Sequence, residues 1–491
     1  MNKKFALLLV LMLALVMGSV TSASAAQIKA TGQWTIEADL SAGNDFQKKG
    51  AVSEDKTFNI AQRVRTAFEF IANENLKGVL DTQIGTANWG TGAMQVGAGR
   101  SISTAAYTLG AAQAGNGNIM LRRGYVDFKW PNTKVNFLVG YQTLSLPSAV
   151  GGGSPVLDDQ LAAAAAVVPI TDGLSLVGGF GRLFEVNPSQ TTTSGANTGS
   201  GTAGDVAFLI ANVDMIKGVS LKPWLAYANL GAKTAATTLA GFQGANSSSI
   251  SGVRAYWGGA ALTVSAFDPF KIMADFNYGK ATWNNNSNTH NDGGRQGFLF
   301  DAAIDYTGLS MMTPELFFAY SSGESGNSTN GGKSDRMPVV GSPQTYALGS
   351  FWLQGGDSLN SGQMNTPDAV MGYWALGLSF KDIKLIDKLS HTVHFIYFKG
   401  TNDVDYLKQK TLTGTQGTNA AYGKFLTTKD SLFEVDVNSK YQIYDELSVG
   451  LELGYISANF NKNAWGAVNS DYQNYGNQDA YKAGLIVNYN F

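Results

Sequence analysis

The sequence contains no cysteine, and histidine is almost absent, with 3 residues in 491. A chain without thiols forms no disulfide, binds no metal through cysteine and has no cysteine nucleophile. Two of the histidines, His391 and His394, are three residues apart on a predicted strand, so they face opposite sides of it and do not share a metal ion. No catalytic, cofactor-binding or metal-binding motif stands out, and we expect that the protein is not an enzyme and needs no cofactor.

Long apolar runs are also lacking beyond the N-terminus, since no later segment approaches the roughly 18 apolar residues of a membrane-spanning helix. At the N-terminus, two lysines precede an apolar stretch (5–20) that ends on the small residues 23–25. This pattern is typical of a secretory signal peptide, here 1–25. A transmembrane anchor is the alternative, but the small residues favour cleavage, which leaves 26–491 as the mature chain.

Charge of either sign is in short supply as well. The formal net charge is -2, and removing Lys3 and Lys4 with the signal peptide makes it -4. No basic excess points to a nucleic acid partner. The chain has only 11 prolines against 58 glycines, with no linker or shift in composition, which favours one strand-rich domain.

What the sequence does contain is a two-residue alternation of apolar and polar side chains, repeated along the chain. In 28–40 the apolar residues fall on even positions and the polar residues on odd positions. The segment 58–70 repeats the pattern, with Phe58, Phe68 and Phe70 opposed to Arg63 and Arg65. A helix would place apolar and polar residues on the same face, so the alternation predicts strands with one apolar face and one polar face.

Eighteen such segments are predicted, although 16 strands remain possible. The connections between them alternate, with long ones after odd strands and short ones after even strands, which is typical of outer-membrane barrels with short periplasmic turns and long external loops. We therefore expect an all-β transmembrane antiparallel β-barrel in the bacterial outer membrane, closed between its first and last strands because an open edge in lipid leaves backbone groups unpaired. Soluble sandwiches and propellers do not require this alternation of loop length. The predicted strands are 28–40, 58–70, 76–89, 119–130, 134–143, 160–169, 174–184, 204–214, 219–230, 250–263, 270–282, 296–308, 313–322, 368–381, 389–400, 430–443, 447–460 and 479–491.

The last predicted strand ends the chain on an aromatic residue, Phe491, with Tyr489, Val487 and Leu485 on the same face. This resembles the assembly signal of outer-membrane barrel proteins. The resemblance implies that the barrel assembly machinery is a partner and that these residues are recognised by it. An ordinary lipid-facing aromatic girdle would give the same pattern.

The mature chain as a whole resembles the bacterial general porins, most closely the homotrimeric porins of sulfate-reducing bacteria. The strand 121–130, a short turn and the strand 135–141 resemble the fourth and fifth strands of that family. The following segment, 144–159, has the place of the third loop, which in the family folds into the barrel and narrows the pore. The resemblance implies a homotrimer in outer-membrane lipid, and the segment 90–118 has the place of the loop that latches neighbouring subunits.

In the resembled family, acids of the inward loop face arginines across the pore. The corresponding residues here are Asp158 and Asp159 in the loop and Arg63, Arg65 and Arg123 on strands. The arginines share the polar parity of their strands, and turning one toward lipid would cost about 2 to 4 kcal/mol at the midplane, so we expect them in the lumen. Together, these acids and arginines form the predicted pore constriction. The alternative is that they are solvated charges in the lumen without a special role.

Arg122 precedes Arg123 and so falls on the apolar positions of its strand, which predicts that it points outward near a membrane interface or that the strand has a different register.

The expected function is a water-filled channel for passive diffusion of small hydrophilic solutes and ions. One alternative is a channel selective for a sugar or an anion, which 18 strands favour and which an aromatic track of Tyr125, Tyr256 and Tyr373 would support. Another is a surface barrel with an adhesive or structural role.

Overall fold

We describe the protein from a computed structural model. It describes residues 27–44, 46, 56–89, 119–184, 203–230, 250–285, 294–326, 335–340, 346–353, 359, 372–405, 425–466 and 476–491. The predicted signal peptide and the predicted latching loop, 90–118, lie outside these ranges. In the described part of the chain, no helix is long and apolar enough to cross a membrane.

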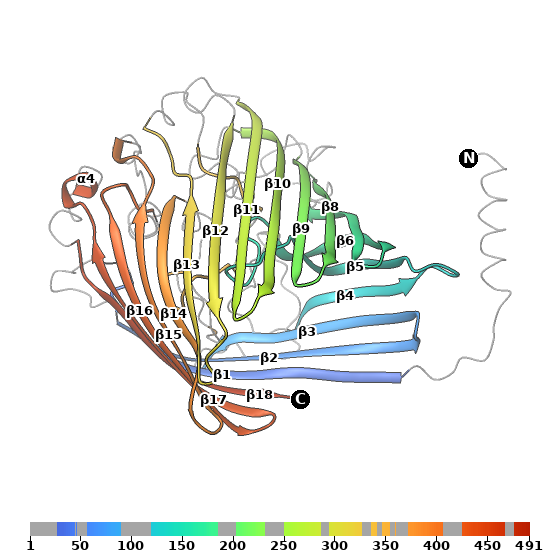
Figure 1. Cartoon of the computed structure of the whole chain (residues 1–491), viewed down its shortest axis with the longest axis horizontal. Coiled ribbons are helices and arrows are strands. Elements are labelled where there is room, and N and C mark those ends of the chain that lie inside the picture. The colour runs from blue at the N-terminus through green and yellow to red at the C-terminus, as the bar shows by residue number, and fades with distance from the viewer. Residues whose placement is uncertain are drawn as a thin grey trace, which may run out of the picture.

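Eighteen antiparallel strands form a single sheet, and each strand pairs with its neighbours in the chain (Figure 1). The sheet closes where β1 pairs with β18, with Trp34 opposite Tyr489. The predicted all-β barrel and its strand number are therefore confirmed. The strands are β1 (Gln27–Ala42), β2 (Lys56–Asn73), β3 (Leu76–Asn88), β4 (Ile119–Lys129), β5 (Asn136–Ser145), β6 (Asp158–Thr171), β7 (Leu174–Phe184), β8 (Gly204–Ile216), β9 (Val219–Leu230), β10 (Ile250–Phe267), β11 (Phe270–Asn285), β12 (Arg295–Tyr306), β13 (Thr313–Ser321), β14 (Tyr373–Ile386), β15 (Leu389–Gly400), β16 (Ser431–Tyr444), β17 (Leu447–Asn459) and β18 (Ala480–Asn490), and one short helix, α4 (Lys462–Gly466), follows β17.

The connections alternate in length as predicted. Those after even strands have two or six residues, whereas those after odd strands have nine to 51. Short turns therefore gather at one end of the barrel, which in this class of protein is the periplasmic end, and long connections gather at the external end.

One strand differs clearly from its prediction. β14 runs over Tyr373–Ile386, whereas the alternation predicted 368–381. Its pairing with β15 shifts register after Phe380, and Asp382 adopts a positive φ of 55°. A bulge of this kind inserts extra residues and breaks the two-residue alternation. The alternation therefore ends near residue 381, whereas the strand continues to Ile386.

The outer face of the barrel is apolar, as the alternation predicted. Leu225, Leu378 and Leu485 are each between 40% and 63% exposed on this face, which in a bilayer contacts lipid. The inner face is less uniformly wet than predicted. Toward the external end it carries buried apolar side chains such as Trp257 and Phe398, because segments of the long connections fill that part of the lumen.

Candidate pore constriction

The segment 146–157 leaves the wall after β5 and crosses the lumen. On the far side, the carboxylate of Asp275 on β11 accepts hydrogen bonds from the backbone N of Ala149 at 2.8 Å, the backbone N of Val150 at 2.8 Å and the hydroxyl of Ser148 at 3.2 Å. Because β5 and β11 are six strands apart, only a segment folded into the barrel makes these contacts. The predicted inward third loop is thus confirmed.

The glycines of this loop have a structural reason. Gly151 and Gly152 have φ values of 73° and 75°, which side chains rarely adopt. A Cβ on Gly151 would also lie 2.7 Å from the ring of Tyr346. The glycine run therefore lets the loop turn closely beneath an aromatic residue from another connection.

That second connection, between β13 and β14, also enters the lumen. The backbone N of Ala347 donates to the carbonyl O of Gly151 at 2.8 Å, and the backbone N of Val340 donates to the carbonyl O of Val156 at the same distance. Two inward segments, 146–157 and 346–353, thus touch each other inside the barrel. The second inward segment was not predicted from the sequence.

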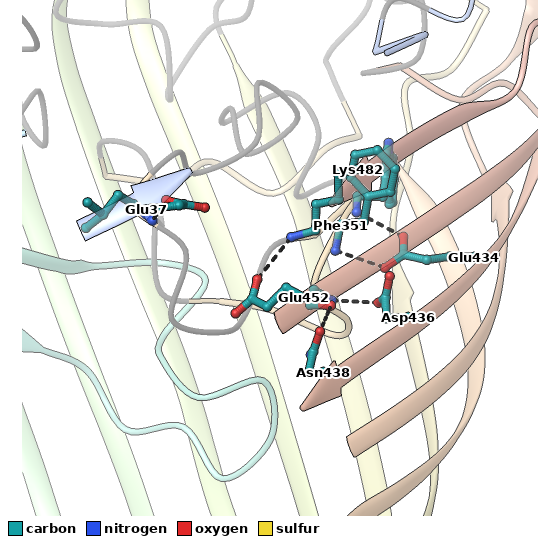
Figure 2. A network of polar contacts seen from close by, with 10 residues as sticks. Glu37, Phe351, Glu434, Asp436, Asn438, Glu452 and Lys482 are labelled. Carbon is teal, nitrogen blue, oxygen red and sulfur yellow. Dashed lines mark hydrogen bonds and ion pairs between the residues drawn. The ribbon is translucent and has the colours of Figure 1, made fainter. Parts of the chain in front are cut away.

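Carboxylates on β16 hold the segment 346–353 by its backbone (Figure 2). Glu434 accepts from the backbone N of Phe351 at 3.2 Å and of Trp352 at 2.9 Å, and Asp436 accepts from the backbone N of Ser350 at 2.8 Å. On β1, Glu37 accepts from the backbone N of Leu359. Glu434 and Asp436 share the inner face because they are two residues apart on a strand.

Apolar packing also holds the segment 346–353, in addition to this clamp formed by Glu434 and Asp436. The ring of Trp352 is fully buried and lies 4.6 Å from that of Phe398 on β15 and 5.4 Å from that of Tyr373 on β14. Tyr346 donates from its hydroxyl to Asp301 on β12 at 2.8 Å. Burial raises the pKa of Tyr346 well above its usual value, so the phenol stays a donor. Together these contacts fix the second segment against β12 and β14–β16.

The opposite part of the wall, β2–β4, carries the predicted arginines. Arg65 on β2 donates from Nε to Gln83 on β3 at 2.8 Å, and Arg63 shares its face. Arg123 on β4 donates from Nε to Asp81 on β3 at 2.9 Å. The structure thus brings Arg63 and Arg65 of β2 and Arg123 of β4 together on the inner face, on either side of β3.

Arg122 joins this group, which settles the two options left by the sequence. The pairing of β3 with β4 shifts register between Asp81 and Thr82, so that Asp81 faces Arg123 and Thr82 faces Leu121. Arg122 is the extra residue of this bulge, and its Nη1 lies 3.0 Å from Asp81. The expectation of an outward Arg122 is wrong, and the different register is the explanation.

The four arginines, Arg63, Arg65, Arg122 and Arg123, are called here the arginine wall. Asp81, only 2% exposed at its side chain, contacts two of them, so that one carboxylate faces the two guanidinium groups of Arg122 and Arg123. Arg122 and Arg123 keep side-chain exposures of 21% and 33% toward the lumen. The arginine wall is therefore a positive surface that solutes can contact.

The two predicted acids take separate positions at the start of β6. Asp159 pairs with Leu144 of β5 and Asp158 pairs with Ser145, so the consecutive side chains lie on opposite faces of the sheet. Asp159 accepts a hydrogen bond from the backbone N of Gln160 at 2.7 Å. Their action together with the arginines stays a prediction. The carboxylates that hold the backbone of the two inward segments are instead Asp275, Glu434 and Asp436.

A cavity of about 600 Å³ lies between the two inward segments and the wall of β11–β16. Its polar lining includes Lys381, which forms ion pairs with Glu315 at 2.8 Å and Asp305 at 2.9 Å, and also Lys271 and His394. Opposite charges lie side by side here. This side of the lumen therefore has no single sign, unlike the arginine wall.

The predicted aromatic track is not formed. Tyr373 is buried beneath the second inward segment, and Tyr256 lies on the outer face, where its ring is 5.8 Å from that of Tyr227. Tyr125, which pairs with the inward Val79, lies on the inner face as Tyr373 does, but Tyr256 does not, so the three rings form no track. Strand parity alone was insufficient because it does not say which side of an isolated strand is the lumen.

The C-terminal residues form part of the barrel seam. Phe491 exchanges two backbone hydrogen bonds with Gly32 of β1, at 2.7 and 3.0 Å, and its ring stacks on that of Tyr489 at 5.7 Å. Leu485 and Tyr489 are exposed on the outer face. Recognition of Phe491, Tyr489, Val487 and Leu485 by an assembly machinery stays a prediction.

No known family profile and no curated protein matches this chain. Solved structures do match it along most of its length. The outer membrane protein OprD from Pseudomonas aeruginosa is 13% identical, with 96% of each chain covered and a TM-score of 0.50. OpdQ from Pseudomonas aeruginosa is 12% identical, with 94% of this chain and 97% of that chain covered and a TM-score of 0.51.

At these identities the likeness concerns the fold. The chain folds as an outer-membrane β-barrel, in agreement with the location predicted from the sequence. The closer resemblance to trimeric porins of sulfate-reducing bacteria stays a prediction.

Proposed function

We propose that the protein is an outer-membrane channel that is selective for small organic anions. The observation that carries the proposal is the arginine wall, where Arg122 and Arg123 share the single carboxylate of Asp81 and Arg65 donates to the uncharged Gln83. Aligned positive charge in a narrow, partly dehydrated passage attracts anions and disfavours cations.

The inward segments support selectivity over unrestricted diffusion. One inward loop also narrows the general porins, whereas here a second segment, 346–353, meets 146–157 inside the barrel, and buried carboxylates fix both. Solutes must therefore pass a rigid constriction beside the arginine wall. The arginine wall is close to the start of the inward segment. Gly124, the residue after Arg123, pairs with Tyr141 of β5. Tyr141 is four residues, or about 13 Å, from Ser145, where the inward segment leaves the wall.

A planar-bilayer experiment with the purified protein tests the proposal. We expect single channels whose reversal potential in a salt gradient shows anion preference, and whose current is blocked by a small carboxylate such as benzoate and left unchanged by a neutral sugar. Blockade by the sugar alone would favour a sugar channel, and passage of every small solute without blockade would favour a general porin. Absence of conductance would contradict all of these and favour an adhesive or structural barrel.

Charge reversal identifies the residues responsible. Arg63→Glu with Arg123→Glu is expected to shift the reversal potential toward cation preference, because the narrowest region loses its positive potential. The matched control, Lys217→Glu with Lys388→Glu, places the same charge change on two exposed periplasmic turns. Equal reversal potentials in the two double variants would contradict the role of the arginine wall.

A homotrimer, an N-terminal signal peptide cleaved after Ala25 and recognition of Phe491 during assembly complete the proposal. Gel mobility before and after heating tests the trimer. N-terminal sequencing of the mature protein tests the cleavage site. Deleting Phe491 and measuring the yield of heat-modifiable barrel tests the assembly signal.

A further inference from the structure

The outer face of β9–β12 carries two cations on a part of the wall whose lipid-facing side chains are mostly apolar or aromatic. Arg254 on β10 is exposed, and its strand partners on this face are Asn229 of β9 and Thr282 of β11. Lys280 on β11 pairs with Tyr256, which puts it on the same face, diagonal to Arg254. Diagonal neighbours of a sheet are about 7 to 8 Å apart, so the two cations are close enough to bind one group.

These two cations have no carboxylate beside them. Among the described residues of β9–β12, no aspartate or glutamate lies on the outer face. The next strand, β8, has Asp205 on this face, but Asp205 is paired with Arg182 of β7 at 2.9 Å. The positive charge of Arg254 and Lys280 is therefore unbalanced by the wall around them.

Aromatic rings fix the depth of the pair relative to the bilayer. Tyr256, Tyr227 and Tyr278 are each at least 41% exposed around the two cations, and Phe267 and Phe270 are exposed at the periplasmic end of the same strands. From Tyr256 to Phe267 the strand rises about 36 Å, or about 28 Å along the membrane normal at a tilt of roughly 40°. This matches two aromatic girdles around an apolar band about 25 Å tall.

Arg254 lies two residues beyond the outer girdle, toward the long connections. It therefore lies at the level of the head groups of the external leaflet, and Lys280 reaches the same level by extending its flexible side chain away from the apolar band. A cation costs little at this depth and attracts the anionic groups of lipids there. Two adjacent cations above tyrosine rings suit a phosphate whose attached acyl chains lie against the wall below.

We propose that Arg254 and Lys280, with Tyr227, Tyr256 and Tyr278, form a binding site for a phosphate group of lipid A in the external leaflet. Both side chains donate to the phosphate oxygens, and the tyrosines contact the sugar and the upper part of the acyl chains. Lipid A is the chosen occupant because it is a phosphate-bearing lipid of the leaflet that faces the long connections. The proposal rests on the outer-membrane location and is independent of channel selectivity.

Native mass spectrometry of the full mature chain, refolded in detergent without lipid, tests this site. Bisphosphorylated lipid A is titrated against the wild type and against Arg254→Gln with Lys280→Gln. We expect binding about 30-fold weaker in the double variant, which corresponds to about 2 kcal/mol for two interfacial cations. Lys217→Gln with Lys388→Gln makes the same charge change on exposed periplasmic turns and is expected to bind like the wild type.

Two further arms separate recognition of the phosphate from other effects. Arg254→Lys with Lys280→Arg keeps both charges and is expected to retain binding, which excludes a folding defect as the cause of any loss. Dephosphorylated lipid A and phosphatidylglycerol are expected to bind more weakly than bisphosphorylated lipid A.

Equal binding of bisphosphorylated and dephosphorylated lipid A, or equal binding by the glutamine variant and its control, would overturn the site. So would a glutamine variant that binds lipid normally and loses only its oligomeric state, because the cations would then contact a second copy of the chain. None of these readouts uses conductance, so the lipid site and the channel can fail separately.

Discussion

The carboxylate of Asp275 offers the sharpest test of how the constriction is held. Asp275→Ala removes the acceptor of the backbone N–H groups of Ala149 and Val150, both at 2.8 Å, and of the Ser148 hydroxyl. Hydrogen bonds to a charged acceptor contribute about 1.5 to 3 kcal/mol each, so the two backbone bonds together contribute about 3 to 6 kcal/mol to the inward position of the loop. Losing the lower figure raises the population of displaced loop by about a hundredfold.

A displaced loop widens the passage, and single-channel recording detects it directly. We expect Asp275→Ala to show larger mean conductance and frequent steps between two levels, because contacts such as Ala347 to Gly151 still return the loop to the lumen. Asp127→Ala is the matched control, since Asp127 is a carboxylate of the β4 wall that accepts from Asn136, outside both inward segments.

The refuting result is a quiet channel of wild-type conductance in Asp275→Ala. It would mean that the packing between the two inward segments holds the loop without the carboxylate. Asp275→Asn gives an intermediate case, since its single acceptor oxygen satisfies fewer of the three donors, and we expect its level changes to be rarer than those of Asp275→Ala.

Three further outcomes follow from the same contacts. Glu434→Gln keeps one acceptor oxygen for two backbone donors, so conductance steps are expected from the second inward segment, and steady wild-type current would contradict the clamp. Trp352→Ala empties a buried site beside Phe398 and is expected to lower the free energy of unfolding by about 3 to 5 kcal/mol in urea titration, whereas a loss below 1 kcal/mol would refute that packing. Gly32→Ala places a Cβ 2.6 Å from the carbonyl O of Arg65 and against the ring of Phe491, so the barrel is expected to change its gel mobility at a lower temperature than Gly78→Ala, whose Cβ would meet nothing within 4 Å, and equal temperatures would count against a tight seam.

Strand positions were predictable because a barrel wall imposes a two-residue period on every strand. The prediction 174–184 coincides with β7, and 389–400 coincides with β15. It failed where bulges break the period, as at Asp382 on β14 and at Arg122 on β4. A bulge depends on how a strand pairs with its neighbour, so it cannot be predicted from the sequence of one strand alone.

The constriction was predictable only in part. The place of 146–157 in the order of strands indicated an inward loop, and parity placed Arg63 and Arg65 in the lumen. Asp81, Asp275 and Glu434 were missed because each looks like any polar residue of the inner face. The pair Glu434 and Asp436 was the available signal, since two carboxylates on one inner face require partners, and those partners are backbone groups of the second inward segment.

The absence of long apolar runs, together with the alternation and the loop lengths, determined by themselves that this chain is a β-barrel of about 18 strands, and the structure fixed the number at 18. These features are local, and lipid on one side and water on the other act on each strand separately. Only the tertiary structure decided which loops fill the lumen, which carboxylates hold them and which cations face lipid. Those outcomes depend on contacts between residues that are far apart in the chain, such as Trp352 with Glu434 and Ala149 with Asp275, and these contacts form only when the strands have assembled.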